Sequence, residues 1–199
     1  MHGKQIDYSE KLLLDYRKVD ALNGVPRFEF GFGLSYTTFG YSGLSISSSG
    51  DVYYVSFSVK NLGSLAGTEK PQLYLGYPAS AGEPKKVLRN FEEVPLGVGE
   101  SRTVTMFVDR RSMRYALSSL LLLLLLLLKI FYFSIWDTPS QSYTRPSGTF
   151  TVYIGASIRD IRLTGTITIP VSFVEPLGRS HVLTGQCESE TSEFGSTLG

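Results

Sequence analysis

Cysteine and histidine are almost absent from this sequence of 199 residues. The one cysteine, Cys187, lies near the end of the chain, and the two histidines are His2 and His181. A disulfide within the chain needs two cysteines, and a structural zinc site needs several cysteines or histidines. The composition therefore excludes a disulfide framework and a cysteine-based zinc site. It also argues against a histidine-dependent catalytic triad or metal site.

A surplus of charge of one sign is missing as well. The chain has 19 basic and 18 acidic residues, which gives a net charge of +1. Nucleic-acid-binding domains carry a basic patch or stripe, and no such surplus exists here. We therefore expect no nucleic-acid partner.

Signals for secretion are missing too. Residues 1–4 are not followed by the apolar stretch of a signal peptide, and no Asn-x-Ser/Thr sequon occurs. We therefore expect no secretory signal within this chain.

Aromatic residues and glycine are abundant, with 12 Tyr, 12 Phe and 20 Gly. Five stretches alternate between apolar and polar residues with the period of a β-strand. Glycine- and proline-containing turns separate these stretches. The pattern predicts an all-β fold, an antiparallel β-sandwich of about seven strands with one apolar face on each sheet. The predicted inward residues are Tyr53, Val55, Phe57, Val59, Leu73, Leu75, Tyr77, Val104, Met106, Val108, Phe150, Val152, Ile154, Leu163, Ile167 and Ile169.

Residues 28–39 divide the chain into two parts of different character. Gly31 and Gly33 stand between aromatic residues there, and glycine allows a backbone to pass close to another surface. The aromatic side chains bring apolar area that we expect to be buried. We interpret this stretch as a packed domain junction.

The residues before the junction are charged and contain few apolar side chains. Residues 12–14 are three leucines that could form a short buried strand. Asp15 and Arg17 could hold a loop through a carboxylate–guanidinium pair, or the loop could be a solvated charged one.

Residues 116–135 interrupt the strand pattern with nine consecutive leucines, Leu120 to Leu128, followed by Lys129. A membrane-spanning helix needs roughly 20 apolar residues, and this run approaches that length only by including Ser and Lys. Its position between strands of one sandwich argues against a span. Residues 171–199 show no periodicity, and their Glu, Ser and Thr content predicts a disordered tail.

The order of short motifs closely resembles the C-terminal region of fungal β-glucosidases of glycoside hydrolase family 3. The resemblance covers residues 7–115 and 136–169. It is carried by Asp7-Tyr8-Ser9-Glu10, Asp15-Tyr16-Arg17, residues 26–39, Val59-Lys60-Asn61-Leu62-Gly63, Pro71-Gln72-Leu73-Tyr74-Leu75, Gly82-Glu83-Pro84, residues 86–91, residues 148–153 and Arg159-Asp160-Ile161.

The resemblance implies three regions. Residues 1–35 would be the C-terminal remnant of an α/β sandwich domain and the junction. Residues 36–170 would be an immunoglobulin- or fibronectin type III-like domain, and residues 171–199 the tail. The family pattern places an aromatic residue directly before Trp136-Asp137, so residues 116–135 would be an insertion after Tyr115, from translated intron sequence. A genuine helix is the alternative.

The resemblance places the catalytic machinery outside this chain. Retaining glycoside hydrolysis needs two carboxylates about 5–5.5 Å apart, and in this family both lie in upstream domains. The carboxylates of this chain fall at strand ends and turns, where solvated surface charge is usual. We therefore predict no catalytic, cofactor-binding or metal-binding residue and no cofactor, and we expect the chain to be inactive alone. The carboxylates considered are Glu92, Glu93, Asp109, Asp137 and Asp160.

Three functions remain open. The first is an accessory fragment that braces the catalytic domains of a secreted β-glucosidase, which hydrolyses O-glycosyl bonds in cellulose or β-glucan. The second is a carbohydrate-binding module that stacks sugars on Tyr54, Tyr74, Trp136 and Tyr143. The third is a β-sandwich anchored in a membrane by residues 116–135. We favour the first, with the catalytic domains as partners, β-glucan as a further candidate partner and no membrane contact.

Overall fold

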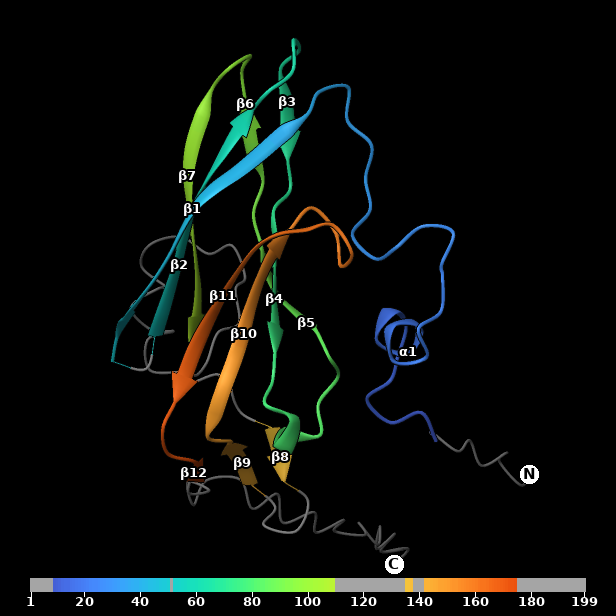
Figure 1. Cartoon of the computed structure of the whole chain (residues 1–199), viewed down its shortest axis with the longest axis vertical. Helices are drawn as coiled ribbons and strands as arrows, with labels where there is room; N and C mark the ends of the chain where they lie inside the picture. Colours follow the sequence, from blue (N-terminus) through green and yellow to red (C-terminus); the bar gives the residue numbers. More distant parts are fainter. Residues whose placement is uncertain (1–8, 51, 110–134, 138–141, 175–199) are drawn as a thin grey trace, which may run out of the picture.

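The computed structural model describes residues 9–50, 52–109, 135–137 and 142–174. Nearly all of the regular structure is β-strand (Figure 1). The elements are, in chain order, α1 (Tyr16–Ala21), β1 (Phe39–Ser49), β2 (Val52–Asn61), β3 (Gly67–Glu69), β4 (Gln72–Gly76), the 3-10 turn η1 (Ala79–Ala81), β5 (Val87–Phe91), β6 (Val94–Leu96), β7 (Ser101–Asp109), β8 (Ile135–Asp137), β9 (Ser142–Arg145), β10 (Gly148–Gly155), β11 (Ile161–Ile169) and β12 (Phe173–Val174).

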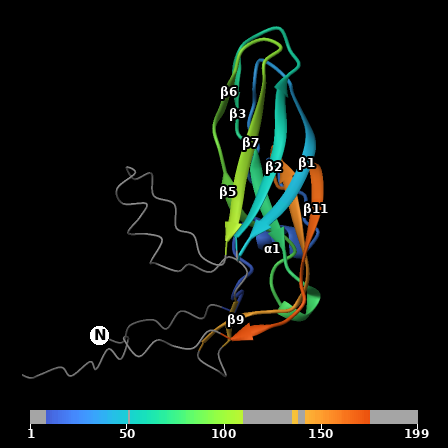
Figure 2. The ribbon, with the colours of Figure 1, turned by 90° about the vertical axis from the view of Figure 1, so that its left-hand side faces the viewer.

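Two antiparallel sheets form the sandwich. One has the order β1-β2-β7 and the other the order β11-β10-β4-β5, so the two sheets together contain seven strands. Figure 2 looks onto the three-stranded sheet, with β7, β2 and β1 side by side. This architecture confirms the predicted all-β sandwich.

The space between the two sheets is filled by the apolar faces that the alternation predicted. Strands β2, β4, β7, β10 and β11 each contribute alternate residues to one core, and most of these side chains are fully buried. Tyr53, Tyr77 and Leu163 are partly buried and pack against that core. The sequence alternation therefore identified the inward face of every main strand to which it was applied.

A buried asparagine joins the end of β2 to three other segments. Asn61 accepts hydrogen bonds from the Thr37 hydroxyl at 2.6 Å and from the Gly63 amide at 3.0 Å. Its amide nitrogen donates to the carbonyl oxygens of Leu65 at 2.7 Å and Leu96 at 3.4 Å. Because a buried amide must have its partners, this side chain fixes the loops around it.

A hydrogen bond and a cation–π contact, both made by Tyr41, connect β1, β3 and β11. The Tyr41 hydroxyl donates to Glu69 Oε1 at 2.7 Å, and the Arg162 guanidinium lies 4.9 Å from the centre of the Tyr41 ring. Burial, together with the bonded Glu69, raises the pKa of Tyr41 well above its usual range, so the hydroxyl stays protonated.

Two smaller sheets extend the sandwich. Strands β3 and β6 pair at one end, and β12, β9 and β8 form a three-stranded sheet. The pairing of Phe173 with Arg145 carries ordered structure to Val174. The sequence placed the start of a disordered tail at residue 171, and within that range residues 173 and 174 pair with β9. The rest of the predicted tail lies outside the described residues.

The residues before the junction also differ from the prediction. Leu12 and Leu14 are exposed and form no strand, and helix α1 begins at Tyr16. The predicted buried strand was wrong, because in the described part of the chain no strand forms backbone hydrogen bonds with residues 12–14.

Within the described ranges, no helix is long and apolar enough to cross a membrane. The predicted insertion lies outside those ranges, apart from Ile135, the first residue of β8.

Candidate docking surface

Residues 9–38, here called the arm, cover the outer face of the four-stranded sheet. In Figure 1, α1 lies on the side of this sheet that faces away from β1-β2-β7. Tyr74 points toward the arm, because its neighbours Leu73 and Leu75 belong to the core, and it is nonetheless 0% exposed. The ring of Tyr16 meets Tyr74 edge-on at 6.5 Å and stacks on Phe30 at 4.4 Å. The arm therefore buries an aromatic side chain that the sandwich alone would leave exposed.

A glutamine holds the arm to the sheet at the start of β4. Gln72 Nε2 donates to the carbonyl oxygens of Gly31 at 3.1 Å and Ala156 at 2.8 Å, and its Oε1 accepts from the Tyr74 hydroxyl. Gly31 has φ +82°, and a Cβ there would lie 2.1 Å from Gln72 Oε1. The backbone angle favours glycine here, and a Cβ would displace the Gln72 amide from its hydrogen bonds.

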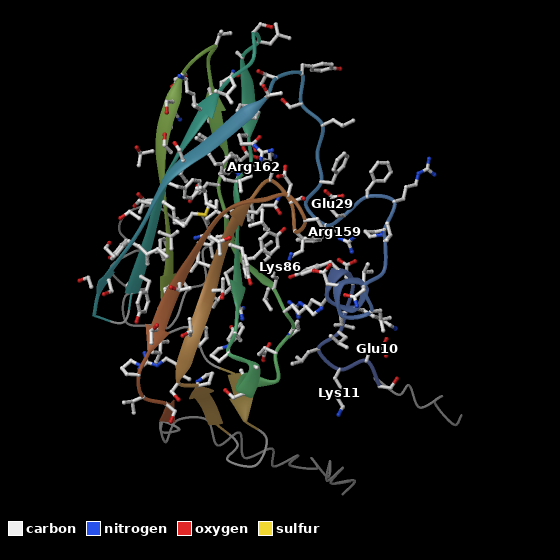
Figure 3. All side chains as sticks on the ribbon, in the orientation of Figure 1. Glu10, Lys11, Glu29, Lys86, Arg159 and Arg162 are labelled. Atoms are coloured by element: carbon white, nitrogen blue, oxygen red, sulfur yellow. The ribbon has the colours of Figure 1, made fainter. Side chains whose placement is uncertain are left out.

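The loop between β10 and β11, residues 156–160, holds the arm from the other side. The Ile158 amide donates to the Phe30 carbonyl at 3.0 Å, and the Ser157 hydroxyl donates to Glu29 at 3.0 Å. Arg159 donates to Asp20 at 3.4 Å and to the Gly24 carbonyl at 2.6 Å. Figure 3 labels Glu29 on the arm and Arg159 on this loop, which lie near each other at the junction. The contacts join segments more than 100 residues apart.

A lysine supports the loop from β5. Lys86 Nζ donates to the Ile158 carbonyl at 2.5 Å, and it lies 5.9 Å from the centre of the Tyr153 ring. Burial lowers the pKa of Lys86. The lysine thus fixes the loop that in turn fixes the arm.

A cavity of about 130 Å³ remains between α1, residues 26–30 and the loop. Asp20, Glu29 and Arg159 line it, and all three take part in the contacts described above. Across the described ranges, no three His, Cys, Asp or Glu side chains gather in a way that could hold a metal ion. The cavity is a packing gap of the junction.

The side of the arm that faces away from the sheet is apolar and exposed. Val25, Leu34 and Tyr36 are 91%, 92% and 97% exposed, and Leu22, Phe28 and Phe32 are also exposed. Only Phe30 and Phe39 of the junction aromatics are half-buried or buried. The expectation that all of them are buried was therefore wrong for this chain, because the sheet covers only one side of the arm. These six exposed residues are here called the apolar strip.

The carboxylates considered from the sequence lie at strand ends, as expected. Glu93 pairs with Lys70 at 2.7 Å on the surface, and Asp160 pairs with Arg162 at 2.7 Å. Glu92 lies beside Glu93 in the turn between β5 and β6. The side chains of Asp109 and Asp137 lie outside the described part. The structure does not test the prediction that the chain has no catalytic residue.

The aromatic residues considered for sugar stacking do not form the proposed row. Tyr54 is 39% exposed on β2, whereas Tyr74 is fully buried under the arm. Placing Tyr74 on an outward surface was therefore wrong, because its outward face is covered by Tyr16. Trp136 and Tyr143 lie in β8 and β9, and their side chains are outside the described part.

Sequence reasoning did not single out Gln72, Ser157 or Arg159 as parts of the junction. The alternation placed Gln72 on the outward face of β4 without showing what covers that face. One signal was available, since an outward Gln-x-Tyr pair within an otherwise apolar strand suggests a second covered surface.

The Asp160–Arg162 pair gives an expected pH dependence of stability. Arg162 donates to both carboxylate oxygens of Asp160, at 3.1 and 2.7 Å, and these hydrogen bonds lower the pKa of that carboxyl. Its contribution is therefore present above the unfolded pKa, about 3.9, and is lost as the pH falls through the lower folded value. Both side chains are partly exposed, so we expect less than about 1 kcal/mol.

Asp160→Asn should accordingly lower the melting temperature at neutral pH and flatten its fall between about pH 4 and pH 2. Thermal unfolding of the full chain across this range measures the effect. In an Arg162→Met background the same substitution should change the profile little. An unchanged acid limb in Asp160→Asn alone would contradict the assignment.

Comparison with known proteins finds a matching domain family and several similar proteins named β-glucosidases. Residues 69–118 match the fibronectin type III-like domain family. The chain is 38% identical over 188 residues to the Aspergillus niger protein named "Probable beta-glucosidase D", covering 84% of this chain and 22% of that protein. It is 41% identical over 178 residues to "Beta-glucosidase cel3A" of Pyricularia oryzae, covering 83% and 20%. The chain thus spans about a fifth of the length of the curated relatives it matches.

Solved structures agree with the sequence comparison. The β-D-glucoside glucohydrolase of Trichoderma reesei superposes with a TM-score of 0.70 at 36% identity, covering 84% of this chain and 24% of that one. β-Glucosidase 3B of Thermotoga neapolitana gives a TM-score of 0.70 at 29% identity, with 84% and 21% covered.

Proposed function

We propose that this chain, a fibronectin type III-like C-terminal piece of the glycoside hydrolase family 3 β-glucosidases, is an accessory part that braces the catalytic domains of the complete enzyme. The arm is the contact. One of its sides is bonded to the sheet and the loop after β10, and the other presents the apolar strip.

The apolar strip is the observation that carries this proposal. Single exposed apolar residues are common on protein surfaces, but here six of them fall within the fifteen residues 22–36. Their backbone is held in place by the sheet, so the strip is presented on a supported surface. A partner that covers it would gain apolar burial at little cost in ordering the arm.

The remaining features of the proposal concern the whole enzyme. The relatives are named β-glucosidases, which supports hydrolysis of O-glycosyl bonds in β-glucan or cellulose fragments by the complete protein, with the chemistry in domains outside this chain. Secretion of that protein is part of the same proposal. The membrane-anchored alternative has no observation in its favour among the described residues.

A chimera tests the bracing role. The matching segment of the Trichoderma reesei β-D-glucoside glucohydrolase would be replaced by this chain, and soluble yield, melting temperature and aryl β-glucoside hydrolysis would be measured. We expect an active chimera. Val25→Asp should lower its yield and melting temperature, because burying an unpaired charge at an interface costs about 2–5 kcal/mol.

Val171→Asp is the matched control, because Val171 is exposed but lies after β11, outside the arm. It should leave the chimera unchanged, and both substitutions should leave the melting temperature of the isolated chain unchanged. Equal behaviour of the two variants in the chimera would refute the bracing role of the apolar strip.

A further inference from the structure

The outer face of the three-stranded sheet is rich in hydroxyl groups. It is the face that Figure 2 presents to the viewer. Three neighbouring rows cross β1, β2 and β7 in register. The rows are Ser42–Ser58–Thr103, Ser45–Ser56–Thr105 and Ser47–Tyr54–Phe107, and the eight residues other than Phe107 are here called the hydroxyl face.

Hydrogen bonds join two pairs of hydroxyl groups, one pair within the hydroxyl face and one pair between Ser58 and Ser101 of the next row. The Ser56 and Thr105 oxygens are 2.9 Å apart, and the Ser58 and Ser101 oxygens are also 2.9 Å apart. Each hydroxyl can donate one hydrogen bond and accept others. A pair that is bonded together therefore keeps capacity for a ligand that both donates and accepts.

Ionisable side chains other than the Tyr54 phenol are missing from the three rows. The nearest on the same face of β2 is Lys60, which pairs with Gly40 and Ser101 one row beyond the hydroxyl face. The outer face of the other sheet differs, since charged residues such as Asp20, Lys86 and Arg159 fasten the arm there. The hydroxyl face is thus electrically neutral at neutral pH, and a neutral partner complements it.

Tyr54 gives this face an aromatic surface at one end. It is 39% exposed and lies opposite Phe107 in the register. An exposed aromatic ring can stack on the C–H face of a sugar ring, while neighbouring hydroxyls bond the sugar's own hydroxyl groups. Because these hydroxyls carry no charge, covering them costs far less desolvation free energy than covering ion pairs.

We propose that the hydroxyl face binds a neutral β-glucan chain lying across β1, β2 and β7, with Tyr54 under one sugar ring. A protein partner is less well suited, since the centre of a protein interface is rich in apolar and aromatic residues and this face has one row with them. The choice of a glucan rests on the proposed function. The hydroxyl face and the apolar strip belong to opposite sides of the molecule, so one domain could contact polysaccharide and catalytic domains together.

The test is retention of the full chain on insoluble cellulose, measured as a binding isotherm, with soluble laminarin as competitor. We expect saturable binding that changes little with salt, because no ion pairs contribute. Thr105→Glu and Tyr54→Ala should each weaken binding about tenfold, the scale of one buried charge or one lost stacking contact. Thr166→Glu, on the outer face of β11, is the matched control and should bind like the unchanged chain.

Three outcomes would overturn the proposal. They are no retention of the unchanged chain, equal loss in Thr105→Glu and Thr166→Glu, and retention that Thr105→Glu leaves intact. The last result would point to adsorption through the apolar strip, which none of these variants alters. Melting temperatures would show that each variant is folded. Failure here leaves the chimera result unaffected, because the chimera tests the arm and not the hydroxyl face.

Discussion

Replacing Gly155 by alanine should destabilise the chain by about 2–3 kcal/mol, the upper range for inserting a methylene-sized group into a packed site. Gly155 ends β10, where the pairing with β11 shifts register. A Cβ at this position would lie 2.1 Å from the Asp160 carbonyl oxygen and 2.9 Å from Ile161 Cα. Both are backbone atoms, so no side-chain rotation can relieve the clash.

The damage should extend from the hairpin to the arm. The loop that would have to move carries the Ala156–Asp160 backbone hydrogen bond and the Ile158–Phe30 contact, each 3.0 Å long. We therefore expect Gly155→Ala to release the arm as well as to lower the free energy of unfolding. Urea denaturation measures the free energy of unfolding, and the rate of tryptic cleavage at exposed Arg27 measures release of the arm.

Gly33→Ala is the control, because a Cβ there meets no atom within 4 Å. It should leave the denaturation midpoint and the cleavage rate unchanged. If Gly155→Ala were as stable as the unchanged chain, the close approach of β10 to the loop would be wrong.

Asn61→Ala should cost about 2–3 kcal/mol, because it leaves several buried groups without their partner. The Thr37 hydroxyl, the Gly63 amide and the Leu65 carbonyl all lose a short hydrogen bond. Asn61 itself is 0% exposed, so water reaches the vacated site poorly. Urea denaturation of the full chain gives the difference in free energy.

Asn90→Ala serves as the matched comparison for Asn61→Ala. Asn90 is half-buried on β5, donates to Phe107 at 3.4 Å and accepts from the next amide at 2.8 Å. Its loss should cost only about 0.5–1 kcal/mol. Similar costs at the two positions would show that Asn61 does not organise the loops around it.

The inward faces of the strands could be predicted from the sequence because strand periodicity is a local property. Phe57 and Met106, for example, alternate with polar neighbours, and both are fully buried in the core. Burial of this kind follows from one apolar face per strand and needs no knowledge of which strand lies next to it.

The covered outer face of β4 could not be predicted in the same way. Gln72 and Tyr74 are buried by residues 16 and 31, which are more than 40 positions earlier in the chain. Periodicity within β4 contains no information about that partner. The exposure of Val25 and Leu34 is unpredictable for a related reason, since a sequence shows which residues are apolar and does not show whether this chain covers them.

The hydroxyl face likewise combines one feature that is predictable from a single strand with others that depend on strand pairing. Tyr54 was identified from its outward position on β2, and the structure confirms that it is exposed. Its neighbours Ser47 and Thr105 come from other strands, and only the register of pairing places them beside it. The sequence of any one of these strands predicts only an ordinary solvated outer face.

During synthesis on the ribosome, the arm emerges well before the loop that fastens it to the sheet. Glu29 is synthesised 128 residues before Ser157, to which it is bonded. At the usual elongation rate of about 5–20 residues per second, that separation corresponds to a delay of roughly 6–26 s. Throughout that interval the apolar side chains of residues 22–36 have emerged, while the loop that fixes them does not yet exist. Chaperones that bind extended apolar segments would therefore meet the arm before the loop that fastens it, and slowing translation between residues 38 and 157 should increase misassembly.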